Sequence, residues 1–195
     1  VNGLERNETL VYNNKNIPFI DFINKDLIWF SIADNVRSIP SMVDGLKPSQ
    51  RKVLYAMRKR KNTEAKVSQL AGYISTETSY HHGEQSIMST VISMAHDFVG
   101  SNNNNILLPV GQFGTRLMGG KDAASPRYIF TKLGESGDYI FNRQDDNILT
   151  YLNDDGLSIE PKYYVPTIPL ILINGADGIG TGFSSNIPCY NPEDI

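Results

Sequence analysis

Apolar residues recur at helical spacing through the first half of the chain. Spacings of three and four residues between apolar positions predict amphipathic helices, because such positions share one helix face. We expect Asp21 to cap the first helix, which ends before Pro40 because a residue preceding proline resists the helical region. Proline is favoured in a first turn, so Pro48 opens the second helix. The four predicted helices span residues 21–38, 48–57, 66–73 and 87–98.

Short β-prone runs replace this pattern after Gly100. Residues 106–110 and 127–133 predict strands, with an exposed glycine-rich excursion between them. Residues 170–173 predict a buried strand that runs into a glycine-rich loop. Two helices with a tight link, followed by hairpin strands, are the pattern of a winged helix. The predicted fold class is therefore α+β, with a helix-turn-helix and a β-wing.

The chain divides into three predicted segments. Residues 1–20 are a lead-in from an upstream domain, residues 21–173 form the main domain, and residues 174–195 begin the next one. Asn191-Pro192-Glu193-Asp194 is a favourable helix start, so we expect the polypeptide to continue. A single cysteine excludes an internal disulfide and suits a reducing compartment. No apolar run approaches the ~20 residues that cross a membrane.

Charge is distributed unevenly along the chain, whose net charge is −3. Residues 34–66 contain nine cations and three acids, whereas residues 135–160 contain seven acids and one cation. A local basic patch is what phosphate binding requires, and the alternative is a solvated basic helix face. We expect the acids of the runs 145–147 and 153–156 to lie in solvated turns, because these runs lack the spacing of a calcium loop. We expect a basic loop at residues 58–61.

Several cations lie where an anion would be bound. Lys47 immediately precedes the second helix, and Arg51 and Lys52 lie in its first turns, where positive charge opposes the helix dipole. A bound anion at this helix start would explain all three, because backbone N–H groups also point outward there. Arg37 either neutralises the end of the first helix or contacts a ligand. The polar run from Tyr80 to Ser86 opens a helix and suits phosphate or groove contact.

Tyr128 lies where a glycine-rich loop is predicted to become a strand, which suits a hydroxyl directed outward. Phenols have a pKa of about 10, so a tyrosine nucleophile needs nearby cations or a base. Arg127 is adjacent in the sequence and would lower the cost of forming a phenolate. The alternative is that Tyr128 has a structural role.

Ile179 is a lone apolar residue within the glycine-rich run 174–182. A nucleotide-binding loop would need a helix directly after the glycines, and the sequence that follows is not helical. Ile179 is therefore either a core residue at a turn or a wedge inserted between base pairs, a known use of isoleucine in DNA bending.

These motifs together resemble the DNA breakage-reunion region of the eukaryotic-type type IIA DNA topoisomerases (topoisomerase II). The resemblance covers roughly residues 21–195 in the same order. It implies a winged-helix domain followed by the start of the adjoining tower region. The motifs that carry it lie at residues 33–40, 44–55, 80–86, 113–116, 119–128 and 174–182.

The resemblance implies a role for each candidate residue. Tyr128 matches the tyrosine that forms a 5′-phosphotyrosyl link, and Arg127 matches the arginine that stabilises the transition state. His82 either accepts the phenol proton or hydrogen-bonds a phosphate oxygen, and Ile179 matches the isoleucine that bends the duplex. The remaining residues that are expected to line the scissile phosphate, in front of Tyr128, are Arg37, Lys47, Arg51, Tyr80, His81 and Ser86.

The resemblance also implies the cofactors and partners. It places the carboxylates that hold Mg²⁺ in a separate upstream domain, supplied to this tyrosine by the partner subunit of a homodimer. ATP is used by another domain, the substrate is double-stranded DNA, and the expected compartment is the nucleus. No metal site is expected in this chain. A non-catalytic winged-helix DNA-binding module, with Tyr128 stacking only, is the alternative.

Overall fold

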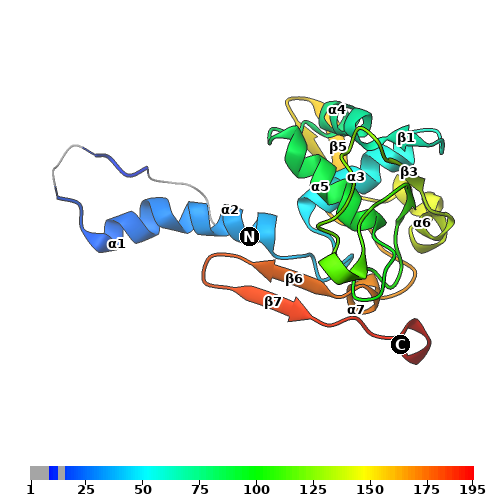
Figure 1. The fold of residues 1–195 in the computed structure, drawn as a ribbon. Coiled ribbons are helices and arrows are strands. Elements are labelled where there is room, and N and C mark those ends of the chain that lie inside the picture. The colour runs from blue at the N-terminus through cyan, green and yellow to red at the C-terminus, as the bar shows by residue number, and fades with distance from the viewer. Residues whose placement is uncertain (1–8, 13–15) are drawn as a thin grey trace.

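A long helix projects from the body of the molecule (Figure 1). It is built from α1 (Phe19–Phe22), a π-helical turn (Ile23–Leu27) and α2 (Ile28–Ser38). The predicted cap at Asp21 is wrong: Pro18 precedes the first helical residue, and its carbonyl accepts hydrogen bonds from the backbone N–H groups of Asp21 and Phe22. The predicted end is confirmed, since Ile39 before the proline is extended.

The computed structural model describes residues 9–12 and 16–195. Predictions for the rest of the lead-in lie outside the described residues. The α+β class is confirmed, since helices and short antiparallel sheets make up the described chain.

Three helices form the centre of the core. They are α3 (Pro48–Lys59), α4 (Val67–Thr78) and α5 (Glu84–Ala95). The opening of α3 at Pro48 is confirmed, but the predicted basic loop is partly wrong, because Arg58 and Lys59 are helical. The guanidinium of Arg58 is buried and donates to the Phe141 carbonyl, which keeps this turn folded against the body.

Helices α4 and α5 differ in length from the predicted helices at residues 66–73 and 87–98. Helix α4 continues past the predicted end at residue 73, and its threonine and serine hydroxyls in this extension donate to carbonyls four residues earlier. It ends at Thr78, and the following residue, Ser79, adopts the left-handed conformation with φ of 46°. Helix α5 ends at Ala95, short of the predicted residue 98.

A three-stranded antiparallel sheet closes one side of the helices. Its order is β1 (Ala65–Lys66), β3 (Phe130–Leu133) and β2 (Leu107–Val110). Strand β2 lies at the edge, which suits Pro109 because an edge position does not require its missing N–H. The predicted strand from residue 127 is three residues too long, since a turn closed by a Tyr128 N–H to Ser125 carbonyl bond precedes β3.

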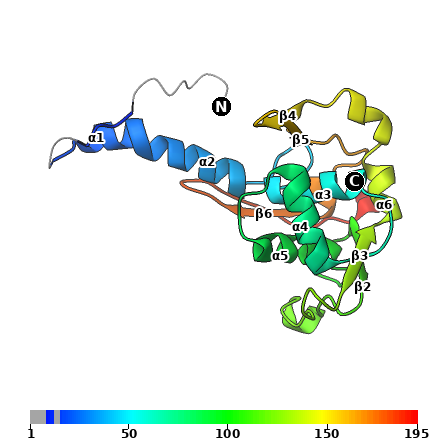
Figure 2. The same ribbon diagram turned by 90° about the horizontal axis from the view of Figure 1, so that it is seen from above.

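The remaining elements wrap the body and lead to the C-terminal end (Figure 2). The predicted strand at residues 170–173 is wrong: this segment is the short helix α7, whose N–H groups at Leu172 and Ile173 donate to the Pro169 carbonyl. The other elements are α6 (Glu135–Ile140), β4 (Tyr151–Asp154), β5 (Leu157–Pro161), α7 (Leu170–Ile173), β6 (Ala176–Ile179), β7 (Ser184–Ile187) and the 3₁₀ turns Arg116–Met118, Arg143–Asn147 and Pro192–Asp194.

Candidate nucleic-acid interface

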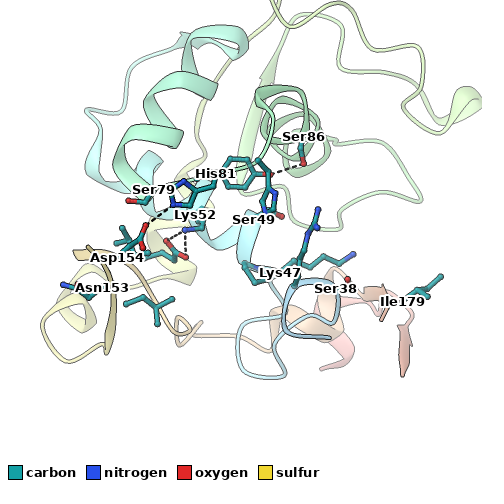
Figure 3. Close-up of a pocket in the computed structure, with 17 residues that line it drawn as sticks. Ser38, Lys47, Ser49, Lys52, Ser79, His81, Ser86, Asn153, Asp154 and Ile179 are labelled. Carbon is teal, nitrogen blue, oxygen red and sulfur yellow. Dashed lines mark hydrogen bonds and ion pairs between the residues drawn. The ribbon is translucent and has the colours of Figure 1, made fainter. Parts of the chain in front are cut away.

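A cavity of about 650 Å³ lies where the end of α2, the start of α3, the α4–α5 link and the β4–β5 hairpin meet. Figure 3 shows Ile179 at one end of this cavity and Asn153 with Asp154 at the other. The structure thus brings together most of the DNA-contacting residues expected from the sequence. Those that line the cavity are Arg37, Lys47, Tyr80, His81, His82, Ser86 and Ile179.

A buried turn places Lys47 at the cavity. The fully buried carboxylate of Asp44 accepts hydrogen bonds from the Leu46 N–H at 3.0 Å and the Tyr164 N–H at 2.9 Å. The Lys47 N–H donates to the Gln50 side chain at 2.8 Å, which caps the first turn of α3. The lysine backbone is therefore held on both sides, while its side chain faces the cavity.

Arg51 does not line the cavity, contrary to its predicted DNA contact. Its Nε donates to Asp44 at 2.7 Å, and its Nη2 donates to the Leu46 carbonyl at 2.9 Å. The side chain is 6 % exposed, so this guanidinium is engaged inside the domain. We assign it to stabilising the turn before Lys47, because a buried carboxylate needs a paired cation.

The link between α4 and α5 presents polar groups to the cavity. The Tyr80 hydroxyl donates to the Ser86 hydroxyl at 3.1 Å, and the edge of the Tyr80 ring packs against His82 with ring centroids 5.2 Å apart. His81 contacts Asp154 at 3.2 Å. Helix α5 starts after Gly83 without a side-chain cap, so its first N–H groups suit an anion.

The acidic segment is only partly solvated: the side chains of Asp146 and Asp154 in the two predicted turns are 35 % and 39 % exposed, and each contacts a distant cationic or imidazole group. Glu160 is 2 % exposed and pairs with the Lys52 ammonium at 2.9 Å. Asp146 pairs with Arg58 at 2.8 Å, and Asp154 contacts His81. The basic and acidic segments of the sequence therefore neutralise one another in part, which the local charge counts do not reveal.

Ile179 ends strand β6 at the tip of a hairpin. Its side chain is 79 % exposed, which excludes its interpretation as a core residue at a turn. The hairpin is closed by a Gly180 N–H to Phe183 carbonyl bond at 2.9 Å. An exposed apolar side chain on a tight hairpin is a suitable shape for insertion between bases.

Tyr128 and Arg127 lie on the exposed turn before β3. The Tyr128 side chain is 68 % exposed, and the Arg127 guanidinium lies over its ring, 5.3 Å from the centroid. Neither residue is among those that line the cavity. The expected grouping in front of Tyr128 is thus only partly present: the cavity gathers most of the residues that are expected to contact phosphate, and Tyr128 lies outside its lining.

Comparison with known proteins identifies the family to which this arrangement belongs. A family model for DNA gyrase/topoisomerase IV (the A subunit) matches residues 37–195. The chain belongs to this topoisomerase family. The resemblance to topoisomerase II that the motifs carry is also confirmed by individual relatives and by a solved structure.

Two eukaryotic type 2 topoisomerases illustrate the similarity. The chain is 60 % identical over 182 residues to DNA topoisomerase 2, mitochondrial, of Dictyostelium discoideum, and 59 % identical over 180 residues to DNA topoisomerase 2 of Candida albicans. These alignments cover 93 % and 92 % of this chain. The chain spans 14 % and 12 % of those relatives' own lengths.

A solved structure of a topoisomerase matches the fold. The Plasmodium falciparum topoisomerase II DNA-binding, cleavage and re-ligation domain superposes with a TM-score of 0.86 and 56 % identity. The match covers 96 % of this chain and 26 % of that one. The chain is therefore homologous to the cleavage and re-ligation region of a type II topoisomerase.

The topoisomerase family implies Mg²⁺, but the described residues offer no ligand set for this ion. Among residues 9–12 and 16–195, no group of three or more His, Cys, Asp or Glu side chains lies together as a metal site. The described residues therefore do not fit the ion. Within the same residues, no helix has both the length and the apolarity to cross a bilayer.

Sequence reasoning missed the residues that support this topoisomerase site. The sequence marks Asp44 only as part of a turn, although an acid seven residues before an arginine is a usable signal for pairing. Asp154 and Glu160 line the cavity beside Lys52, a cation that the sequence places in the first turns of α3. The two acids carry no local signal, because their partners lie 73 and 108 residues away.

Proposed function

We propose that the chain is part of an ATP-dependent type II DNA topoisomerase that breaks both strands of a duplex transiently, passes a second duplex through and religates the first. The observation that carries this proposal is the cavity, which gathers cations, histidines and hydroxyls in a region homologous to topoisomerase II. Such groups suit a phosphodiester backbone.

The chemical step that we propose centres on Tyr128. Its phenolic oxygen attacks a phosphorus atom, so an O–P bond to tyrosine forms while the bond between phosphorus and the 3′-oxygen breaks. The phenol gives up its proton to a base, and the departing oxygen takes one to become a 3′-hydroxyl. The reverse step religates the strand, and the phosphate stays linked through its 5′-oxygen throughout.

Arg127 supports this step through charge. A pentacovalent phosphorane carries more negative charge than the phosphodiester, so a fixed guanidinium stabilises it preferentially. The contact between Arg127 and the Tyr128 ring keeps the two groups together on one turn. His82, which shares the cavity with Lys47 and Arg37, is suited to hydrogen-bond the phosphate. The segment at residues 80–86, which leads into α5, would add contacts from Tyr80, His81 and Ser86 to the DNA backbone, since all three line the cavity.

The finer fold assignment belongs to the same proposal. Helices α3 to α5 with the β1-β3-β2 sheet would form the winged helix of residues 21–173, and residues 174–195 would lead into the tower. Ile179 would enter the base stack and bend the duplex. Its exposure at a hairpin tip supports this role.

The remaining parts of the enzyme would lie outside this chain. An upstream domain would hold Mg²⁺, a further domain would use ATP, and a homodimer would bring one subunit's metal to the partner's tyrosine. We place the enzyme in the nucleus. One relative is described by name as mitochondrial, so imaging of the tagged protein is the relevant test of compartment.

Substitution of Tyr128 by Phe tests the nucleophile. In the full-length protein, Tyr128→Phe should abolish DNA-linked protein trapped by denaturant, while duplex affinity stays within about twofold, because only the attacking oxygen is lost. Tyr139→Phe is the matched control, since Tyr139 is 79 % exposed on α6. Covalent complexes that persist in Tyr128→Phe would disprove the assignment. A parent protein that binds duplex but forms no covalent complex would favour the binding module.

A further inference from the structure

The hairpin that carries Ile179 lies against the last turns of α2. In Figures 1 and 2 the β6–β7 hairpin runs toward this helix, and hydrogen bonds join the two. Arg37 and Ser38 at the end of α2 line the same cavity as Ile179. One helix therefore borders both the proposed phosphate contacts and the proposed wedge.

Two glycines allow the β6–β7 hairpin to approach α2 closely. A β-carbon on Gly178 would overlap the Ser38 carbonyl oxygen, and one on Gly180 would overlap Asn35 Oδ1. Successive residues of a strand face opposite sides. Gly178 and Gly180 thus turn one side of β6 toward α2, and Ile179 between them is directed to the other side, where it is exposed.

Polar side chains of α2 hold the hairpin turn in this position. The Thr181 hydroxyl donates to Asp34 Oδ2 at 2.7 Å, and the Asn35 Nδ2 donates to the Thr181 carbonyl at 3.1 Å. Asp34 Oδ1 also accepts from the Ser38 hydroxyl at 3.2 Å, which orients the carboxylate. Both hydrogen bonds join residues about 146 positions apart in the sequence, and both are made with Thr181 in the hairpin turn.

We propose that Asp34 and Asn35 are positioning residues that fix the hairpin on α2 and thereby set where Ile179 enters the duplex. This inference rests on the proposed function, since it requires Ile179 to bend DNA. The clasp, defined as Asp34, Asn35 and Thr181, holds the backbone two residues beyond Ile179. It acts on bending through geometry, because none of its members supplies the wedge itself.

Bending by clasp variants of the full-length protein tests the inference. A duplex labelled at both ends reports the ratio of bent to straight DNA by energy transfer. Thr181→Val keeps the shape but removes the hydroxyl, and loss of one hydrogen bond to a carboxylate should lower this ratio by at least about fivefold. Thr181→Ser keeps the hydroxyl and should bend DNA like the parent. Thr76→Val is the matched control, because that exposed hydroxyl donates only within its own helix.

A double-mutant cycle separates the clasp from general destabilisation. Asp34→Ala and Thr181→Val should each reduce bending, and the double variant should be no worse than either alone, because both remove the same bond. Duplex affinity and the thermal midpoint should change little in Thr181→Val. Additive effects, or a Thr181→Ser variant that bends as poorly as Thr181→Val, would overturn the inference.

The variant Ile179→Ala separates a failure of the clasp inference from a failure of the proposed DNA-bending role of Ile179. If Ile179→Ala loses bending while the clasp variants bend normally, the clasp is refuted and the wedge stands. If Ile179→Ala bends normally, the wedge itself is refuted, and the clasp inference is refuted with it. Reduced bending in both Ile179→Ala and Thr181→Val, with Thr181→Ser unaffected, supports both.

Discussion

Cations on either side of the α3 start are used in opposite ways. Arg51 and Lys52 pair with the buried acids Asp44 and Glu160, and of these two cations only Lys52 also borders the cavity. Within the part of the chain that the structure describes, Arg37 and Lys47 line the cavity and form no ion pair. Positive charge that looks continuous in the sequence is therefore divided between internal pairing and an open surface.

The difference lies in which anionic groups each cation can reach. A buried charge is tolerated only with a partner, so Arg51 is matched by Asp44 and Lys52 by Glu160. Lys47 lies only four residues before Arg51, yet its side chain opens onto the cavity, where a diffusible or macromolecular anion can approach. The first kind of cation should govern folding and the second should govern binding.

The largest effect should come from breaking an internal pair. Arg51→Leu leaves the Asp44 carboxylate buried without its cation, so we expect a loss of about 3–5 kcal/mol in the free energy of unfolding. Urea denaturation of the 195-residue chain measures it. Lys47→Leu is the control and should change stability by less than about 0.5 kcal/mol. Equal losses in the two variants would erase the distinction between the two kinds of cation.

An intermediate effect is expected on DNA binding. Lys47→Ala should weaken duplex affinity without sequence preference and reduce the magnitude of the salt slope by about 1, because one phosphate contact is removed. Titrations at several salt concentrations provide the slope. Lys61→Ala serves for comparison, because this exposed lysine of the same basic segment does not line the cavity. An unchanged slope in Lys47→Ala, or an equal change in Lys61→Ala, would contradict the assignment.

The smallest effect concerns His96, a partly buried base. Burial lowers the pKa of His96, opposed by a hydrogen bond with the Phe113 backbone and by Asp97 and Asp122. The unfolded chain then binds more protons than the folded chain just below the ordinary pKa of about 6.5, so stability should fall as pH drops through that value. His96→Gln should show a smaller decrease in melting temperature between about pH 7.5 and 5.5. An undiminished decrease would assign the pH dependence to other groups.

Local patterns predicted much of the fold. The helix ending before Pro40 and the one opening at Pro48 were predictable because proline acts within one or two residues of itself. The segment at residues 170–173 was mistaken for a strand because a short apolar run has no period that separates the two states. In the structure the carbonyl of the flanking Pro169 accepts the hydrogen bonds of α7, so this segment forms a turn of helix and not a strand.

The candidate site divides in the same way. The sequence alone was sufficient to identify the topoisomerase motifs, and the resemblance that they carry grouped Arg37, Lys47 and Ile179 as candidates. Only the tertiary structure decided that Arg51 is buried against Asp44 and that Asp34 reaches Thr181. The physical reason is that a side chain's charge is local to the sequence, whereas its partner and its exposure depend on segments that folding brings from far away.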